Sequence, residues 1–398
     1  MLCVELFAGA GGAALGLETA GFRHGALVEW DADACATMRA AGLRPVIEGD
    51  VRDLDTIEST VEQGYGYEPI TLLWSSFPCQ AWSVAGARKG SQDERNGWPW
   101  TVDAIDRFKP KWFLAENVRG LTFHKKGNKK PCPGKKTPGT GDPTRCPGCY
   151  LDMVIIPQLK ERYAHAGYFI LDAADFGVPQ HRRRLMVWAG PEPLEAPQPT
   201  HGPKTDTPWV SMGEALKLGD FVWDSMRNTA ANPKQERPTP SSEPAPTVGG
   251  KGNQMVQRVI GGGRNPQSSE LEKTRNYRDL TDEPSTTVTA AQIGNAGPWV
   301  IERPSPTVSC VEYKGSNDSY RDYTKEGVRP KMNKASDALW LGTGRRRLTV
   351  AECAKLQDFP DDHPFQGSTK RSRFQQVGNA VPPKLAEVVG QLIADKES

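Results

Sequence analysis

The sequence predicts an α/β fold in which a parallel sheet carries helices on both faces, joined to a smaller domain of strands and loops. Short apolar or β-branched runs alternate with helix-like segments from the first residue to about residue 195. Beyond about residue 191 the chain is rich in Pro, Gly, Ser and Thr and has few helix-length periods. The 398 residues are enough for a large domain and a smaller partner.

Each element of the predicted sheet follows from a local pattern. The expected strands are the apolar runs at 3–7, 26–30, 44–49, 70–77, 112–118, 169–176 and 183–190. Helix-like segments lie at 13–21 and 31–42, and residues 151–167 have the period of an amphipathic helix between two strands. In such a sheet, functional side chains are expected on loops at the carboxyl ends of the strands.

The changes in composition divide the chain into three parts. Residues 1–195 are predicted to form the main domain, which a basic, cysteine-containing insertion interrupts at about 122–150. Residues 197–343 are predicted to form the loop-rich domain. Residues 344–398 return to helical patterns, so we expect them to complete the main domain.

Two local signals refine the later parts of the chain. A short sequence recurs as PAPTV at 244–248, PSTTV at 284–288 and PSPTV at 304–308. Repeated turn-then-strand units explain this echo, and a recurrent Pro turn in an irregular domain explains it equally well. Near the end, Thr349 and Glu352 have the spacing of a capping box, and the prolines at 382–383 suit the start of a helix.

Composition and charge exclude several classes of protein. The near balance of 50 basic and 48 acidic side chains argues against a histone-like binder, so a polyanion would be gripped by local basic clusters, which lie at 124–145, 182–184, 345–347 and 370–373. The sequence shows neither a signal peptide nor a membrane-spanning run, which predicts a cytosolic protein. Its eight cysteines are then expected to be reduced thiols, available for catalysis or for metal.

A glycine-rich turn marks the first candidate ligand site. Gly9, Gly11 and Gly12 lie between a predicted strand and a predicted helix, where the backbone can approach a nucleotide-like ligand. Glu29 ends the next strand, where a carboxylate can accept hydrogen bonds from ribose hydroxyls. The same glycines with Ala14 also satisfy a dinucleotide fingerprint, and a turn without any cofactor is a further alternative.

A cysteine on a loop is the candidate nucleophile. Cys79, in SSFPCQAWS, follows the strand candidate at 70–77 and is placed for use as a thiolate. An inert, packed cysteine is the alternative. ENV at 116–118 ends another predicted strand, and QHRRR at 180–184 precedes the next one.

The order PCQ, ENV and Gln-x-Arg-x-Arg resembles the signature of the DNA (cytosine-5)-methyltransferases of prokaryotic or phage type. FAGAGG near the start resembles the first cofactor motif of this family, and RLTVAECAKLQDFP and QVGNAVPP resemble its ninth and tenth motifs. The resemblance thus covers both flanks of the loop-rich region. It implies a Rossmann-like S-adenosylmethionine-dependent methyltransferase sheet with a target-recognition domain. The chain departs from the common pattern in SSFPCQAWS, where small glycines often precede the proline and phenylalanine often follows.

The resemblance implies how the catalytic residues act. The Cys79 thiolate adds to carbon 6 of cytosine, which makes carbon 5 able to attack the methyl group. Glu116, as a carboxylic acid with a raised pKa, meets the charge at N3, and Asn117 positions the reacting groups. Arg184 binds the O2 of the base, and Arg182 supports Glu116 or the cysteine loop; a phosphate contact is the alternative for either arginine. Gln80, Ser83 and Gln180 are expected to help Asn117 position the substrate.

The same resemblance implies S-adenosylmethionine as the cofactor. Phe7 and the glycines are assigned to the methionine side, and Glu29 to the ribose. Trp30 is assigned to a face of the adenine and Asp50 to its amine, each with a structural alternative. The expected cofactor residues are Phe7, Gly9, Gly11, Gly12, Glu29, Trp30, Asp50, Val51, Pro78 and, at the amino-acid end, Asn379.

The expected partner is double-stranded DNA, from which the target cytosine must be turned out. Residues 197–343 would recognise the target sequence. A cognate restriction endonuclease is expected in a restriction-modification system, and an orphan or phage methylase is the alternative; a monomer is adequate for the chemistry. Competing interpretations are an RNA cytosine-5 methyltransferase, a non-catalytic DNA binder and a nicotinamide oxidoreductase, and the last leaves PCQ, ENV and QHRRR unexplained.

The insertion suggests chemistry of its own. His124, Cys132 and the CPGC pair Cys146 and Cys149 offer the ligands of a tetrahedral structural zinc site. The alternative is a flexible basic loop with incidental cysteines. Because the insertion follows the strand that ends in ENV, its lysines are expected on the substrate side, near phosphates.

Overall fold

The computed structural model describes residues 1–78, 96–124, 146–217 and 345–398 without interruption. Between these last two segments it describes only residues 221–225, 239–240, 242, 244–245, 254–258, 311–312 and 321–322.

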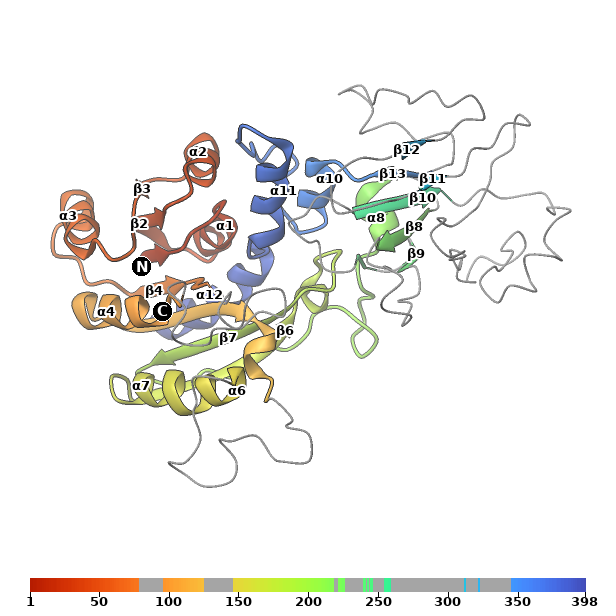
Figure 1. Cartoon of the computed structure of the whole chain (residues 1–398). Helices are drawn as coiled ribbons and strands as arrows, with labels where there is room; N and C mark the ends of the chain where they lie inside the picture. Colours follow the sequence, from red (N-terminus) through yellow and green to blue (C-terminus); the bar gives the residue numbers. More distant parts are fainter. Residues whose placement is uncertain are drawn as a thin grey trace, which may run out of the picture.

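A seven-stranded sheet forms the centre of the molecule (Figure 1), in the order β3-β2-β1-β4-β5-β7-β6. Its strands are β1 (Leu2–Leu6), β2 (Arg23–Glu29), β3 (Val46–Glu48), β4 (Leu72–Ser75), β5 (Trp112–Val118), β6 (His165–Asp172) and β7 (Arg183–Gly190). Each of the seven predicted apolar runs overlaps one of these strands, and the runs at 112–118 and 183–190 match β5 and β7 residue for residue. The predicted strand content of the main domain is therefore confirmed.

One strand departs from the parallel sheet that the alternating pattern predicts. β7 runs antiparallel to both of its neighbours, β5 and β6. Only residues 173–182 connect β6 to β7, and a parallel crossover needs a dozen residues or more. Part of this connection is a 3-10 helix (Ala173–Phe176), which replaces the second half of the strand predicted at 169–176.

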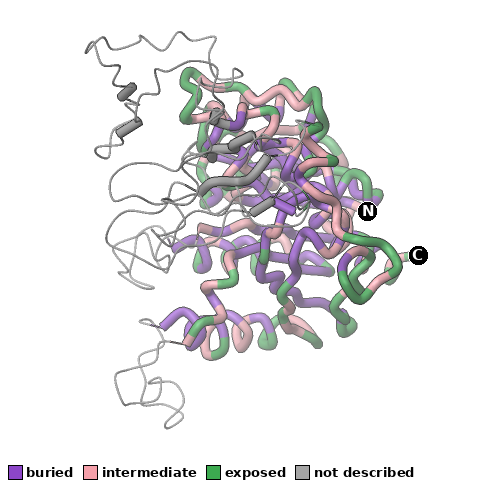
Figure 2. Tube along the Cα trace, turned by 90° about the vertical axis from the view of Figure 1, so that its right-hand side faces the viewer, coloured by how far each residue is buried: buried purple, intermediate pink, exposed green. Residues whose placement is uncertain are grey.

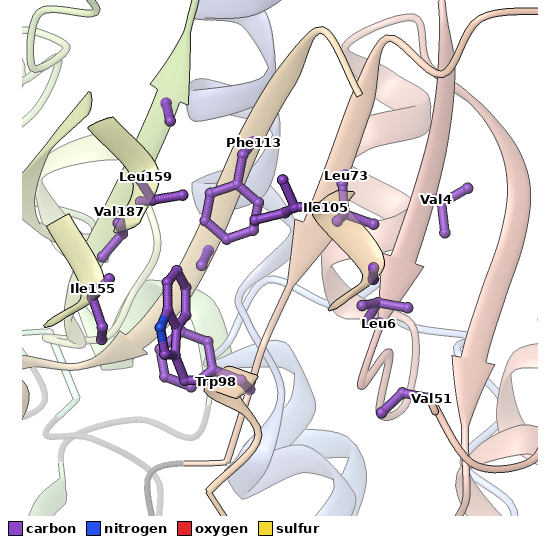
Figure 3. Close-up of a cluster of buried hydrophobic side chains, with 14 of the residues drawn as sticks. Val4, Leu6, Val51, Leu73, Trp98, Ile105, Phe113, Ile155, Leu159 and Val187 are labelled. Carbon is purple, nitrogen blue, oxygen red and sulfur yellow. The ribbon is translucent and has the colours of Figure 1, made fainter. Parts of the chain in front are cut away.

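Helices cover both faces of the sheet, as predicted. On one face lie α3 (Leu54–Tyr65), α4 (Trp98–Phe108) and a continuous helical stretch made of α6 (Pro147–Tyr150), a π-helical turn (Leu151–Ile155) and α7 (Ile156–Lys160). Figure 3 shows the core between them, where Trp98 and Ile155 from the helices approach Phe113 and Val187 from the strands. On the other face, α1 (Gly12–Thr19) and α12 (Pro383–Glu397) enclose a second apolar cluster. Figure 2 shows this buried interior as the purple part of the trace.

The helix predicted at 151–167 is shorter than expected. It ends at Lys160, and β6 begins at His165. The π-helical turn lies just before Pro157, which lacks the N–H that a regular helix would use there.

The C-terminal part returns to the main sheet. Thr349 and Glu352 form the predicted capping box at the start of α10 (Val350–Lys355). α11 (Lys370–Asn379) follows, and α12 begins at the prolines and packs against α1. The contact is close, since a side chain on Gly16 of α1 would lie 2.0 Å from the carbonyl oxygen of Pro383.

The loop-rich region contains a second, antiparallel sheet in the order β13-β10-β8-β9. In Figure 1 it lies beyond α10 and α11. Its strands are β8 (Phe221–Ser225), β9 (Thr239–Pro240), β10 (Gln254–Arg258) and β13 (Arg345–Arg347); β11 (Val311–Glu312) pairs with β12 (Arg321–Asp322), and α8 (Met212–Leu216) precedes them. β13 falls just inside the segment assigned to the C-terminal part, so this sheet crosses the expected boundary at 343/344. The division into domains itself stays a prediction.

The α2 helix (Ala32–Ala40) completes the main unit beside β3.

Within the described ranges, no helix combines the length and the apolar character needed to cross a membrane.

Candidate active site

The glycine turn joins β1 to α1 in a conformation that needs glycine. Gly11 caps the helix with φ +81°, in the left-handed region. A side chain on Gly12 would lie 2.1 Å from the carbonyl oxygen of Val381, in the loop before α12. The predicted first motif and the predicted tenth motif therefore meet at the amino end of α1.

Glu29 closes this turn from the end of β2. Its Oε2 accepts the Gly9 N–H at 2.8 Å, and its Oε1 accepts the N–H groups of Trp30 and Asp31, each at 2.9 Å. A carboxylate offers about four acceptor positions, so these three bonds leave room on Oε2 for a ligand hydroxyl. Burial raises the pKa of Glu29, although the three backbone bonds oppose this.

Aromatic rings gather beside the turn. Trp30 exposes 83% of its surface at the end of β2, which is unusual for so large an apolar ring. Phe7 has φ +58°, a strained conformation for a residue other than glycine, and its ring stacks on Trp100 with centroids 6.5 Å apart. A side chain on Gly97 would meet both Phe7 and Pro78 within 2.9 Å, so these two predicted cofactor residues lie together.

Asp50 has a partner that the sequence analysis did not identify. The Arg52 side chain holds its carboxylate, and hydrogen bonds from Arg52 lower the pKa of Asp50. The Arg52 guanidinium also lies over the Trp100 ring, 5.0 Å from its centroid. Val51 is buried in the core, and Asn379 is exposed at the end of α11. A row from Asp50 to Phe7 thus runs through Arg52 and Trp100, two residues without a local sequence signal.

A buried acid lies in β1. Glu5 is fully buried, and neither of its carboxyl oxygens has a hydrogen-bond partner among the described residues. Burial, and then the nearby Glu29, raise the pKa of Glu5 well above its usual value. The sequence analysis missed this residue, although a single charge inside the apolar run CVELF is a detectable signal.

The predicted base-binding residues meet across β5 and β7. Arg184 Nε lies 2.6 Å from Glu116 Oε1, and both side chains are about nine-tenths buried. The contact depends on the antiparallel pairing, which places Arg184 opposite Val118 and next to Glu116 on the same face. The structure thus brings together an acid and a guanidinium that are far apart in the sequence.

Asn117 holds the chain just before the predicted nucleophile. Its Nδ2 donates to the carbonyl oxygen of Phe77 at 3.1 Å, and its Oδ1 accepts the N–H of Val118. Phe77 and Pro78 lead directly into Cys79, which lies outside the described residues together with Gln80 and Ser83. The contact therefore fixes the upstream base of the cysteine loop to β5.

Among the described residues, Arg182 contacts the carboxyl end of α11. It is 1% exposed, and its Nη2 donates to the carbonyl oxygens of Gly378 and Ala380 at 2.9 and 2.7 Å. Burial lowers the pKa of Arg182, the nearby Arg184 adds to this, and Glu116 opposes it. Arg182 thus links the arginine motif to the end of α11, which carries Asn379.

An acid organises the turn before β7. Asp172 accepts the N–H of Arg182 at 2.8 Å and contacts the side chains of His181 and Arg183 at 3.1 Å. Burial would raise the pKa of Asp172, but these hydrogen bonds outweigh it and the pKa is lowered. This residue was also missed, since its partners follow it by a turn of unpredicted shape.

Gln180 is buried and faces the protein. Its Nε2 lies 3.5 Å from the carbonyl oxygen of Leu356, and it pairs with Ala245 in an isolated bridge. Ala245 belongs to the first PAPTV segment and exchanges backbone hydrogen bonds with Pro179 and His181. These contacts dock a piece of the loop-rich region beside the arginine motif.

Three described residues at the two ends of the cysteine-containing insertion form a compact cluster. One ligand atom each from His124, Cys146 and Cys149 lie within 4.8 Å of one another, and Cys132 lies outside the described residues. His124 Nδ1 is 3.6 Å from Cys149 Sγ, while its Nε2 is 3.2 Å from Asp152 Oδ2. A side chain on Gly148 would lie within 2.9 Å of the His124 ring, so the glycine of CPGC admits this ring.

Comparison with known proteins agrees with the motif order. The sequence profile of the family described as "C-5 cytosine-specific DNA methylase" matches residues 1–135 and 152–395. The Type II methyltransferase M.NgoMIV of Neisseria gonorrhoeae is 29% identical, covering 98% of this chain and 96% of the relative. The Type II methyltransferase M.NaeI of Lentzea aerocolonigenes is 28% identical over 98% of this chain and 74% of its own length.

The fold is also found among solved structures. The S. pombe Dnmt2 methyltransferase superposes with a TM-score of 0.54 at 11% identity, covering 100% of this chain and 99% of that one. A Spodoptera frugiperda DNMT2 variant gives a TM-score of 0.53 at 12% identity, with 98% and 99% covered. At these identities the likeness concerns the fold alone.

Proposed function

Because the chain belongs to the C-5 cytosine-specific DNA methylase family, and is thus a DNA cytosine-5 methyltransferase that uses S-adenosylmethionine, we propose that Cys79 is its nucleophile and that Glu116 and Arg184 act on the target base. The observation that carries the proposal is the buried Glu116–Arg184 ion pair at the end of β5. Asn117 on the same strand end binds the chain two residues before Cys79. The acid, the guanidinium and the chain that leads to Cys79 therefore meet at the end of β5.

The residues divide the chemistry of addition between them. The Cys79 thiolate forms a bond to carbon 6 of the cytosine, and the electron pair of the 5,6 double bond becomes available at carbon 5 as charge moves toward N3. Glu116 meets N3 with a proton, and Arg184 donates to O2, which keeps the ring over the thiolate. Arg182 holds the carboxyl end of α11 and acts as a positioning residue.

Bound S-adenosylmethionine supplies an electrophilic methyl group to carbon 5, and the residues at the ends of β1 and β2 fit such a ligand. Glu29 keeps an acceptor position for a ribose hydroxyl, and Trp30 offers an exposed face for a purine. Glu5 is a buried carboxyl without a described partner, which suits a cofactor with an ammonium and a sulfonium group. We assign Glu5 to this cationic end.

The substrate of the proposed reaction is a cytosine turned out of double-stranded DNA, with residues 197–343 recognising its sequence. Because the relatives are Type II methyltransferases, we assign the chain to the modification side of a restriction-modification system with a cognate endonuclease. Its action belongs in the cytoplasm of a bacterial cell or a phage-infected host, where such DNA lies. One chain supplies every residue named above, so a monomer is sufficient.

Transfer of labelled methyl to duplex DNA of mixed sequence, followed by bisulfite sequencing, tests this proposal. We expect label at carbon 5 of cytosine within one short motif, loss of label with Cys79→Ser, and retention with Cys353→Ala, a buried cysteine elsewhere in the chain. Label on RNA but not on DNA would contradict the assigned substrate, and a fully active Cys79→Ser variant would contradict the assigned nucleophile.

A structural zinc ion is a second proposal, independent of the first. His124, Cys146 and Cys149 provide nitrogen and sulfur ligands in one cluster, and Cys132 is the predicted fourth ligand. The family match omits residues 136–151, so both CPGC cysteines lie outside the residues that it matches. Metal analysis of the purified protein is expected to find about one zinc per chain. Protein that carries no zinc, and takes none up when zinc is supplied, would contradict the proposal.

A further inference from the structure

We propose that Tyr150 positions the nucleophile loop through Asn96, and that the metal cluster at the start of the same helix holds Tyr150 in place. The second half of this inference rests on the proposed zinc. Cys79 lies in the segment between residues 78 and 96, and Asn96 is the first described residue after it. Contacts that hold Asn96 therefore fix the downstream end of the segment that contains Cys79.

The hydrogen bonds at this return point come from the helical stretch that begins at CPGC. Asn96 is 5% exposed, and its Nδ2 donates to Tyr150 Oη at 2.9 Å. Two residues on, Trp98 Nε1 donates to Gln158 Oε1 at 2.7 Å. Both acceptors belong to the stretch 147–160, so this stretch anchors the downstream base of the loop at two points.

The metal cluster connects that stretch to the strand that holds the other base. Asn117, at the end of β5, binds Phe77 upstream of Cys79. A 3-10 turn (Arg119–Thr122) leads from β5 to His124, which faces Cys146 and Cys149. An ion at this cluster would join the exit of β5 to the start of α6, and so would tie together the two elements that anchor the loop.

Local chemistry agrees with a fixed metal site at this junction. The Phe123 carbonyl oxygen accepts the Gly148 N–H at 3.1 Å, so the two segments already touch. His124 directs Nδ1 to the cysteines and Nε2 to Asp152, which is the arrangement of a metal-bound histidine oriented by a carboxylate. Asp152 lies on the same helical stretch as Tyr150, two residues farther on.

Kinetics of four single variants and one double variant test the inference. Tyr150→Phe removes only the hydroxyl that Asn96 contacts, and Cys149→Ser removes a proposed ligand. Tyr163→Phe is the matched control, because the Tyr163 hydroxyl is buried and has no hydrogen-bond partner among the described residues. Asn96→Ala, alone and combined with Tyr150→Phe, completes a double-mutant cycle.

We expect Tyr150→Phe to keep its zinc and to lower kcat about tenfold, the effect of one buried hydrogen bond, with the KM for S-adenosylmethionine unchanged. Cys149→Ser is expected to lose the zinc and at least as much of kcat. Tyr163→Phe should match the unmodified protein, and the double variant should be no slower than the slower single one. Thermal unfolding of each variant shows whether it has folded.

Three outcomes separate this inference from the proposals on which it builds. Wild-type kcat in Tyr150→Phe overturns the inference. Loss of zinc from Cys149→Ser at unchanged kcat also overturns it and leaves the zinc proposal standing. A wild-type enzyme that methylates DNA and carries no zinc overturns the zinc proposal, and with it the metal's part of this inference.

Discussion

The two halves of the main sheet build their sites in different ways. At β1 and β2, the predicted cofactor residues lie at the strand ends or within the turns that follow them, and the contacts are made with backbone N–H groups, as Glu29 shows. At β5 and β7, side chains make contacts between distant segments, as in the Glu116–Arg184 pair and the bonds of Arg182 to backbone carbonyl oxygens at the end of α11. The cofactor half is thus local and the base half is assembled by tertiary structure.

This difference has a chemical reason. A cofactor with hydroxyls and an adenine can be held by turns at the ends of parallel strands, where backbone groups converge. A cytosine ring must be contacted at N3 and O2 and attacked at carbon 6. This needs an acid, a guanidinium and a thiol at fixed mutual distances. Changes in the base half should therefore affect the rate of transfer, while changes in the cofactor half should affect binding.

We expect the largest effect from a substitution in the base half, the part of the site at β5 and β7. Glu116→Gln retains the size of the side chain and removes the acid, so we expect kcat to fall by about a hundredfold or more, the usual contribution of a general acid. Single-turnover methyl transfer measures the rate, and calorimetric titration measures cofactor affinity, which should stay within about twofold of the wild type. An equal loss of rate and cofactor affinity would erase the distinction between the two halves.

In the cofactor half, Glu5→Gln should change protein stability and cofactor binding in opposite directions. Folding raises the pKa of Glu5, so its native state becomes less stable as pH rises from the ordinary value of 4.5 toward the raised one. The glutamine variant lacks this penalty, and its melting temperature without cofactor should exceed that of the wild type by a margin that grows as the pH rises above about 5.

The same variant should bind S-adenosylmethionine more weakly, because the carboxylate assigned to its cationic end is gone. Melting scans over pH and equilibrium binding at pH 7.5 measure the two effects. A variant that melts below the wild type at neutral pH, or that binds the cofactor equally well, would contradict the role of Glu5.

The smallest expected effect concerns Trp30. Because 83% of this residue is exposed, Trp30→Ala should change the free energy of unfolding of the cofactor-free protein by no more than about 0.5 kcal/mol. Loss of the stacked ring should weaken cofactor binding about fivefold to tenfold. Urea unfolding and equilibrium binding provide the two numbers, and a variant with lower stability but unchanged affinity would assign Trp30 to structure.

The same comparison explains what could be predicted from the sequence. Glu29, Glu116 and the Thr349–Glu352 capping box were identified correctly as features of strand and helix ends, because short segments encode them. The antiparallel course of β7 was missed because it depends on the shape of the turn at 173–182.

Long-range contacts were beyond sequence patterns for the same reason. Arg182 reaches carbonyl oxygens almost two hundred residues away, and Asn96 meets Tyr150 across the insertion. Cys79 itself lies outside the described residues. The proposed role of Cys79 is therefore argued from the hydrogen bonds on either side of it, one from Asn117 and one to Tyr150.

The most direct test of the central claim uses a duplex whose target cytosine carries fluorine at carbon 5. After addition of the thiolate and methyl transfer, carbon 5 has no proton to lose, so the covalent complex cannot break down in the usual way. With S-adenosylmethionine present, we predict a stable adduct with one added methyl group, and peptide mass spectrometry should locate the bond to DNA at Cys79. An adduct on another residue, or methylated product without any adduct, would contradict the account.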